Sequence, residues 1–190
     1  RNIGTIGGNV CNGVTSADSA SSLFAYNAIL ELTGPKGIRQ VPIQEFYTGP
    51  GKTVRCHEEV MTAIRIRRRD YEGHTGCYIK YGKRNAMEIA TLGCACLVKL
   101  SLDKKVVEDM RIAYGVAAPT PVRCPETEKA VSGKAVSKAL LLQTGKGVLN
   151  EVNPRTSWRA SKEFRLQLVE ELAKRAMAQA IRNGGGEVDA

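Results

Sequence analysis

The stretch TIGGN, which begins at Thr5, combines two adjacent glycines with hydrogen-bonding side chains. Because Gly7 and Gly8 lack a Cβ, their backbone N–H groups can approach a ligand closely. Successive free N–H groups form an anion-binding concavity that suits a pyrophosphate. Asn9 adds a side-chain hydrogen bond, and Asp18 offers an acceptor to a ribose hydroxyl or an adenine amine. The pattern indicates a nucleotide-phosphate loop, with an ordinary glycine turn as the alternative that spacing alone leaves open.

A second glycine-containing stretch, GPGKT at residues 49–53, contains the last residues of a P-loop motif. The motif G-x-x-x-x-G-K requires a glycine at position 46, where this chain has Phe46. A strand rather than a helix is expected after the stretch. The sequence therefore argues against a nucleoside triphosphatase.

Six cysteines stand at irregular spacings, and no C-x-x-C occurs among them. Cys94 and Cys96 are close, but they lie in a stretch that alternates like a strand, so both point to one face. We interpret them as buried reduced thiols rather than as metal ligands. His57 and His74 are isolated, so the sequence predicts no metal site and no catalytic acid or base.

The chain carries a formal net charge of +9, with the densest basic cluster in IRIRRRDYEG at residues 64–73. Such a charge suits nucleic acid, an acidic partner protein or a phosphorylated cofactor. Aromatic residues make up only 5% of the chain and no RNA-binding motif is present, so we expect no nucleic-acid partner and interpret the cluster as a solvated linker. No apolar run is long enough to span a bilayer and the first residues do not form a signal peptide, which predicts a cytoplasmic protein without membrane contact.

The order of the expected elements indicates an α+β fold with strands first and helices last. A composition shift at residues 67–76 divides the chain into domains 1–70 and 71–190. Hydrophobic periodicity and turn residues predict a short helix followed by strands in the first domain, and an antiparallel meander covered by about three helices in the second. The expected elements are a helix within 19–30, a strand pair within 28–46, a loop at 46–56, a strand at 58–68, strands at 89–101 and 106–117, and helices from Pro125 onward.

The longest expected helix spans residues 161–183 and stops at the glycines that follow. Its apolar positions recur at i, i+3 and i+4, which is typical of a helix packed on a core. The apolar face comprises Phe164, Leu168, Val169, Leu172, Ala173, Met177, Ala180 and Ile181.

The whole chain resembles the FAD-binding subunit of molybdenum hydroxylases, the family of xanthine dehydrogenase and carbon monoxide dehydrogenase. The opening RNIGTIGGNVCNGVTSADSA is similar to the second flavin-contacting segment of that family, R-N-x-x-T-I-G-G-N-I followed by S-x-D. The resemblance continues through FYTGPGKT, EEVMTAIRI, YIKYGKRNAMEIATLGCA, IAYGVAAPTPVRC and SWRASKEFRLQLVEELA. The last two segments resemble bacterial xanthine dehydrogenase subunits in particular.

The resemblance implies roles for individual residues. The backbone from Gly4 to Asn9 is expected to hold the FAD pyrophosphate, and Asp18 is expected to meet the nucleotide or the ribitol. Lys83 and Arg84 are expected to line an approach for NAD⁺. The cofactor-binding residues expected in this way are Gly4, Thr5, Ile6, Gly7, Gly8, Asn9 and Asp18 for the phosphates and nucleotide, Val60 and Met61 beside the flavin, and Ile79 and Lys80 at the isoalloxazine, where a lysine would stabilise the reduced ring.

The same resemblance implies an electron-transfer component without acid–base catalysis of its own. Electrons from a molybdenum-cofactor subunit would pass through [2Fe–2S] clusters on another chain to FAD and then to NAD⁺. The glycine-rich segment that forms the other side of the pyrophosphate site in this family has no counterpart here, so the first FAD subdomain is expected to be lacking. This leaves a flavin-free docking module of the same complex as the alternative function.

Overall fold

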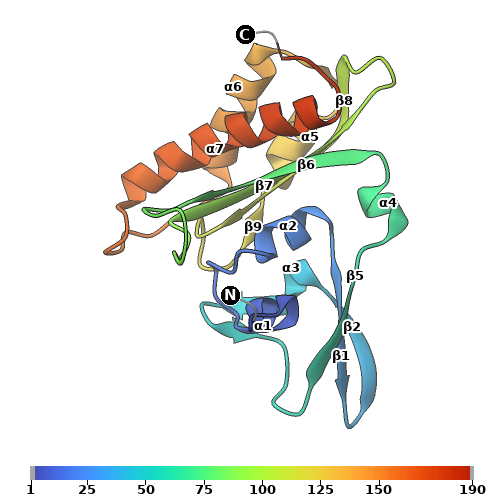
Figure 1. Cartoon of the computed structure of the whole chain (residues 1–190), viewed down its shortest axis with the longest axis vertical. Coiled ribbons are helices and arrows are strands. Elements are labelled where there is room, and N and C mark those ends of the chain that lie inside the picture. Colours follow the sequence, from blue (N-terminus) through green and yellow to red (C-terminus); the bar gives the residue numbers. More distant parts are fainter. Residues whose placement is uncertain (1–2, 189–190) are drawn as a thin grey trace.

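The computed structural model describes residues 3–188, and its first strands form a three-stranded antiparallel sheet (Figure 1). β1 (Ile29–Gly34) and β2 (Gly37–Pro42) form a hairpin around a Pro-Lys turn. Gly37 closes this turn with a φ of +102°, a conformation that glycine adopts without strain. β5 (Val60–Arg65) pairs with the other edge of β1, so that the order is β2-β1-β5. The strands predicted for this part of the chain are confirmed.

Short elements surround this first sheet. They are α1 (Ile6–Cys11), α2 (Ala20–Ala25), α3 (Ile43–Phe46), β3 (Tyr47–Gly49) and β4 (Lys52–Thr53). β3 and β4 pair with each other, so the stretch predicted as a loop at residues 46–56 contains a small hairpin. The GPGKT stretch lies in this hairpin and does not lead into a helix, which agrees with the argument against a P-loop.

α2 is shorter than the helix expected within residues 19–30. Asn27 has a φ of +49°, in the left-handed region that ends helices, and β1 begins two residues later. Ser19 occupies the N-cap position, but its side chain makes no capping hydrogen bond. The Ser19 hydroxyl instead donates a hydrogen bond to the side-chain oxygen of Asn9.

A larger antiparallel sheet forms the second part of the chain. Its order is β10-β8-β7-β6, with the short β9 paired to β8. The strands are β6 (His74–Tyr81), β7 (Leu92–Leu100), β8 (Val106–Gly115), β9 (Val122–Arg123) and β10 (Lys134–Ala135). The two strands predicted at 89–101 and 106–117 are therefore the central β7 and β8 of the meander.

Helices cover one face of this larger sheet (Figure 1). They are α5 (Pro125–Val131), α6 (Lys138–Gly147), the 3-10 turn η1 (Val148–Asn150) and α7 (Lys162–Asn183). Ser137 and Ser161 cap α6 and α7 by accepting backbone N–H groups, and Gly184 ends α7. The predicted α+β fold with three helices over an antiparallel sheet is confirmed.

The larger hydrophobic cluster lies between this sheet and its helices. β7 and β8 contribute alternate residues to it, including Cys94, Cys96 and Tyr114, and α7 contributes most of its predicted apolar face. Phe164 is the exception, because it is 40% exposed and packs edge-on against Tyr81 rather than in the core. The two strand cysteines are free and fully buried, as predicted, and burial raises the pKa of both thiols.

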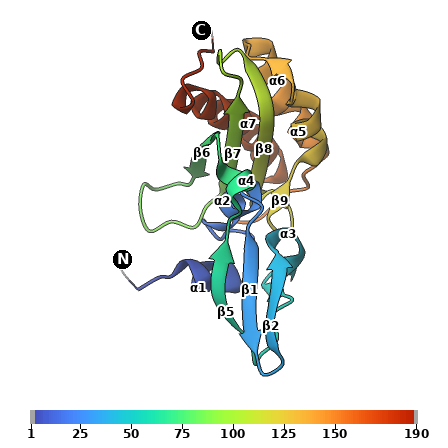
Figure 2. The same ribbon diagram turned by 90° about the vertical axis from the view of Figure 1, so that its right-hand side faces the viewer.

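The opposite face of β7 and β8 supports the first part of the chain. Figure 2 shows α2 between this face and the first sheet, and Ala95, Leu97 and Ala113 belong to the smaller hydrophobic cluster together with the buried residues of β1 and α2. The small side chains at positions 95 and 113 allow the helix to approach the strands closely. The two sheets are therefore joined by one packed contact, in which Ala95, Leu97 and Ala113 lie against α2 and β1, and we call this contact the seam.

The linker between the sheets contains the arginine cluster and α4 (Arg68–Tyr71). The cluster is mostly ion-paired: Arg65 contacts Glu31 at 2.7 Å, and Arg67 contacts Asp70 at 2.7 Å. These pairs support the interpretation of the cluster as a structural, solvated linker. No helix within residues 3–188 is long and apolar enough to cross a membrane.

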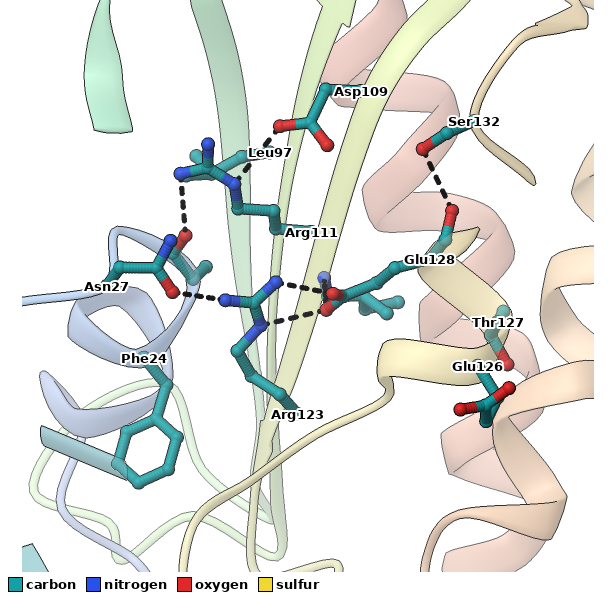
Figure 3. A network of polar contacts seen from close by, with 12 residues as sticks. Phe24, Asn27, Leu97, Asp109, Arg111, Arg123, Glu126, Thr127, Glu128 and Ser132 are labelled. Carbon is teal, nitrogen blue, oxygen red and sulfur yellow. Dashed lines mark hydrogen bonds and ion pairs between the residues drawn. The ribbon is translucent and has the colours of Figure 1, made fainter. Parts of the chain in front are cut away.

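Polar contacts around Asn27 reinforce the seam (Figure 3). The Asn27 amide donates to Asp70 at 2.9 Å, and its carbonyl oxygen accepts from Arg123 and from Gln44. Arg123 also pairs with the buried Glu128, whose carboxylate accepts the backbone N–H of Ile112 at 2.9 Å. Asn27, whose backbone is in the left-handed region, thus connects the end of α2 to the linker and to β9 through its side-chain hydrogen bonds.

Candidate functional site

The glycine-centred opening forms the start of a helix rather than the predicted loop. Thr5 is the N-cap of α1, and its hydroxyl oxygen accepts the backbone N–H of Gly8 at 3.0 Å. The first N–H groups of a helix have no partner within it. Among residues 3–188, Thr5 accepts from Gly8 and from Asn9, and the backbone N–H groups of Ile6 and Gly7 have no partner at this end of α1.

Two glycines leave open space at this end of α1 among residues 3–188. A Cβ added at Gly4 or Gly7 would meet no other atom within 4 Å, whereas one at Gly8 would lie 3.0 Å from the Thr5 hydroxyl. Ile6 is 61% exposed on the same turn. The described residues therefore fit an anionic group that approaches the backbone at this end of the helix.

Asn9 has a structural role that the sequence did not suggest. Its carbonyl oxygen accepts the backbone N–H of Ser19 at 3.1 Å and the Ser19 hydroxyl at 2.6 Å. This contact uses the oxygen of the Asn9 amide and fixes the turn around Asp18. A phosphate accepts hydrogen bonds, so the expected contact with a cofactor would come from the amide nitrogen of Asn9 and stays a prediction. The contact with Asn9 explains why the Ser19 hydroxyl does not cap α2.

Asp18 and Lys80, predicted separately, contact each other. The Lys80 ammonium donates to the Asp18 carboxylate at 2.6 Å, although the residues lie in different parts of the chain. Tyr78 lies on the same face of β6 as Lys80, two residues earlier. Burial first, and then the nearby Asp18 carboxylate, raise the pKa of the Tyr78 phenol. Tyr78 was not among the predicted site residues, although strand alternation from Lys80 points to it.

Of the other predicted residues, Val60 and Met61 lie near α1, whereas the Ile79 side chain faces away from Lys80. α1 packs beside β5 (Figure 2), where Val60 is 66% exposed and Met61 is partly buried against the smaller cluster. Ile79, in contrast, packs against the larger cluster on the helix-covered face of the sheet, opposite Lys80. The Ile79 side chain therefore points away from Lys80, and the predicted contact of Ile79 with a flavin stays a prediction.

Lys83 and Arg84, predicted to line an NAD⁺ approach, have local partners. Arg84 pairs with Glu88 at 2.9 Å and donates to the carbonyl oxygen of Met87. The Lys83 ammonium lies 5.8 Å from the ring centroid of Trp158. An NAD⁺ approach along these side chains stays a prediction.

The described residues contain no metal site. No group of three or more histidine, cysteine, aspartate or glutamate side chains within residues 3–188 is arranged to hold a metal ion. The residues that the structure brings together are backbone donors, one ion pair and one phenol. Such a set can bind and orient a phosphorylated, aromatic cofactor, but it holds no obvious acid–base pair.

Two family descriptions match the chain. Residues 77–180 match the CO dehydrogenase flavoprotein C-terminal domain, and residues 1–67 match the FAD-binding domain in molybdopterin dehydrogenase. The chain is 43% identical, over 99% of its length, to the xanthine dehydrogenase FAD-binding subunit of Escherichia coli O157:H7. It is 32% identical, over 94% of its length, to the glyceraldehyde dehydrogenase medium chain of Sulfolobus acidocaldarius.

A solved structure has the same fold. Carbon monoxide dehydrogenase from Hydrogenophaga pseudoflava superposes with a TM-score of 0.88 and 30% identity over 96% of this chain. This chain spans 64% and 62% of the two relatives and 62% of the superposed chain. On the fold and the family matches together, the chain belongs to the family of FAD-binding flavoprotein subunits of molybdenum hydroxylases.

Proposed function

We propose that this chain forms the flavin-holding part of a xanthine dehydrogenase-like molybdenum hydroxylase. The observation that carries the proposal is the start of α1, where Gly4 and Gly7 leave open space among the described residues next to the first backbone N–H groups of the helix. The pair formed by Asp18 and Lys80 adds a carboxylate and an ammonium group from the other part of the chain.

Each of these groups has a defined task in the proposal. The N–H groups at Ile6 and Gly7 bind the pyrophosphate of FAD, and Thr5 keeps the turn in the required conformation by capping Gly8. Asn9 orients the turn that carries Asp18. Val60 and Met61 offer apolar contact beside α1.

Lys80 supplies an ammonium group, paired with the Asp18 carboxylate, beside the proposed flavin ring, where an ammonium donor would favour the reduced cofactor. When bound, FAD supplies a redox centre that accepts electrons from [2Fe–2S] clusters of a partner chain and delivers hydride to NAD⁺. The chain's own contribution is positioning and electrostatics, because none of the described site residues forms an acid–base pair.

The proposed partners are a molybdenum-cofactor subunit and a [2Fe–2S] subunit. Xanthine is favoured as the substrate of the assembly, because the relative with 43% identity is described as a xanthine dehydrogenase subunit. A division into domains 1–70 and 71–190 is supported by the two family matches, which end at residue 67 and begin at residue 77. A cytoplasmic location remains part of the proposal.

A glycine substitution tests the flavin site. We expect Gly7→Val, made in the full-length protein that contains this chain, to reduce bound FAD at least about tenfold, because the branched side chain would fill the space beside the donors. Gly49→Val is the matched control, since Gly49 also faces open space but lies in β3. The measurement is flavin absorbance per mole of purified protein.

The outcomes separate the two candidate functions. Full flavin occupancy in Gly7→Val would refute the assignment of α1. A wild-type protein that contains no flavin but assembles with its partner subunits would support the alternative of a docking module.

A further inference from the structure

A tight turn before α7 exposes the only tryptophan of the chain. Trp158 is 78% exposed at the tip of a turn closed by backbone hydrogen bonds between Ser157 and Ala160. The ring is flanked by two cations: the Arg159 guanidinium lies 4.2 Å and the Lys83 ammonium 5.8 Å from its centroid. These contacts are within the range of cation–π attraction.

A buried arginine holds this turn in place. Arg165 is 2% exposed, and its guanidinium donates to the carbonyl oxygen of Arg155 and, at 2.8 Å, to the Ser157 hydroxyl. Its Nε is buried without a hydrogen-bond partner. Burial, reinforced by Arg155 and Arg159, lowers the pKa of Arg165. Burying an arginine without a carboxylate is costly, so the fixed geometry of this turn calls for an explanation beyond packing.

Apolar side chains extend the surface from the turn onto the neighbouring loop. Tyr81 packs edge-on against Phe164, and both are about 40% exposed. Met87 is 86% exposed with a φ of +53°, and Arg84 holds its carbonyl oxygen. Loop 82–91 and the turn before α7 lie at the same end of the molecule (Figure 1).

The composition of this surface is that of a protein interface. Tryptophan, tyrosine, phenylalanine, methionine and arginine are enriched at interface centres, where tryptophan and arginine also carry much of the binding energy. Isolated exposed apolar residues need no explanation, but here Tyr81 packs on Phe164, and Trp158 lies against Arg159 and Lys83. We call this set, Tyr81, Lys83, Met87, Arg155, Trp158, Arg159, Lys162 and Phe164, the tryptophan surface.

The charges of the tryptophan surface indicate the chemistry of its partner. Among residues 3–188, no ion pair with a carboxylate is recorded for Lys83, Arg155, Arg159 or Lys162, whereas most arginines elsewhere are paired. In a symmetric dimer, these cations would face the same cations of the second copy, and this repulsion disfavours self-association. The complement is a surface with carboxylates around an apolar centre.

We propose that the tryptophan surface docks the [2Fe–2S] subunit through an acidic face of that subunit. Lys80 of β6 lines one surface hollow together with Tyr81 and Met87, so the tryptophan surface adjoins the proposed flavin side of the chain. Electrons enter at the flavin in the proposed function, and the subunit that donates them must bind near it. This inference rests on the proposed function.

The test measures the affinity of the purified full-length flavoprotein for its cognate [2Fe–2S] subunit. We expect Trp158→Ala to raise Kd about 30-fold, as expected for a central tryptophan. The double reversal of Lys83→Glu and Arg159→Glu is expected to weaken binding further and to remove most of its salt dependence. Leu102→Ala and Lys138→Glu are the controls, because Leu102 is fully exposed on another loop and Lys138 begins α6.

Three results would overturn the proposal. The first is an unchanged Kd in both variants, and the second is loss of affinity for the molybdenum-cofactor subunit only. The third is tight binding of a 20-nucleotide oligouridylate that requires Trp158, which would make the surface a nucleic-acid site. Flavin content is measured in every variant: its absence from the wild type contradicts the proposed function, whereas Kd alone tests the docking surface.

Discussion

The two sheets of this molecule differ in what supports them. In the first sheet, β2 is exposed at most positions and β1 buries alternate residues on one face. In the second, β7 is buried at seven consecutive positions, because helices cover one face and α2 covers the other. One strand thus contributes to both hydrophobic clusters.

Because of this difference, the first part of the chain depends on the second sheet for its folded structure, whereas the second part does not depend on the first. The smaller cluster includes Ala95, Leu97 and Ala113 of the second sheet, so the first part uses that sheet as its base. Among residues 3–188, the larger cluster contains no residue that precedes the linker. We infer that the second part can remain folded when the first opens, but not the reverse.

The largest effect is expected from the larger cluster. Met110 is fully buried in β8, and Met110→Ala is expected to lower the free energy of unfolding by about 3 kcal/mol through loss of burial and a residual cavity. Chemical denaturation measures the loss, and hydrogen exchange should show reduced protection in both sheets.

Leu32→Ala is the counterpart in the first sheet, since Leu32 is equally buried in β1. Its effect on hydrogen exchange should be confined to β1, β2 and β5. Equal loss of protection in β7 and β8 would show that the two parts unfold as one unit and would contradict the comparison.

A smaller effect is expected at the seam. Asn27→Ala removes the hydrogen bonds to Asp70 and Arg123 and places alanine at a φ of +49°, which together should cost about 2 kcal/mol. Asn27→Gly loses the same bonds without the backbone strain, so it should cost less. Thermal unfolding of both variants separates the two contributions, and equal costs would mean that strain at this position is negligible.

The smallest effect concerns acid stability of the first sheet. Arg39, followed by the backbone N–H of Cys56, holds the pKa of Glu59 at about 2, below its ordinary value of 4.5. A carboxylate with a lowered pKa stabilises the fold above its unfolded pKa and loses this contribution as pH falls through the folded value. The Tm difference between wild type and Glu59→Gln should therefore shrink from pH 5 to pH 2.

Glu58→Gln is the matched control for this titration, because Glu58 is the exposed neighbour. It should show little Tm difference from wild type at either pH. A Tm difference for Glu59→Gln that stays constant down to pH 2 would contradict the assigned role of Arg39.

Most of the fold could be predicted from local patterns. Alternation identified β5, β7 and β8, and the apolar periodicity together with the glycines that follow identified α7. The short helix α1 was missed because two glycines are poor helix formers, and the cap by Thr5 compensates for them. The exposure of Phe164 also escaped the pattern, since its partner Tyr81 comes from a distant strand.

The candidate site was less predictable than the fold. Resemblance pointed to Asp18 and Lys80 separately, but 62 residues separate them in sequence and only the tertiary structure reveals their ion pair. Asn9 was predicted to contact a ligand, which stays a prediction, but its oxygen also accepts two hydrogen bonds from Ser19 that the sequence did not reveal. Side chains that can serve either a ligand or a neighbouring turn look the same in a sequence.

The reactivity of the free cysteines reports whether the helices have separated from the larger sheet. Cys56 is exposed, while Cys94, Cys96 and Cys124 are buried in the larger cluster, where burial raises the pKa of their thiols. A thiol reagent reacts with thiolates, so it meets Cys56 in the native protein and the buried thiols only when the helices leave the sheet. The alkylation rates of Cys94, Cys96 and Cys124 therefore measure how often the second part of the chain opens, and no label has to be introduced.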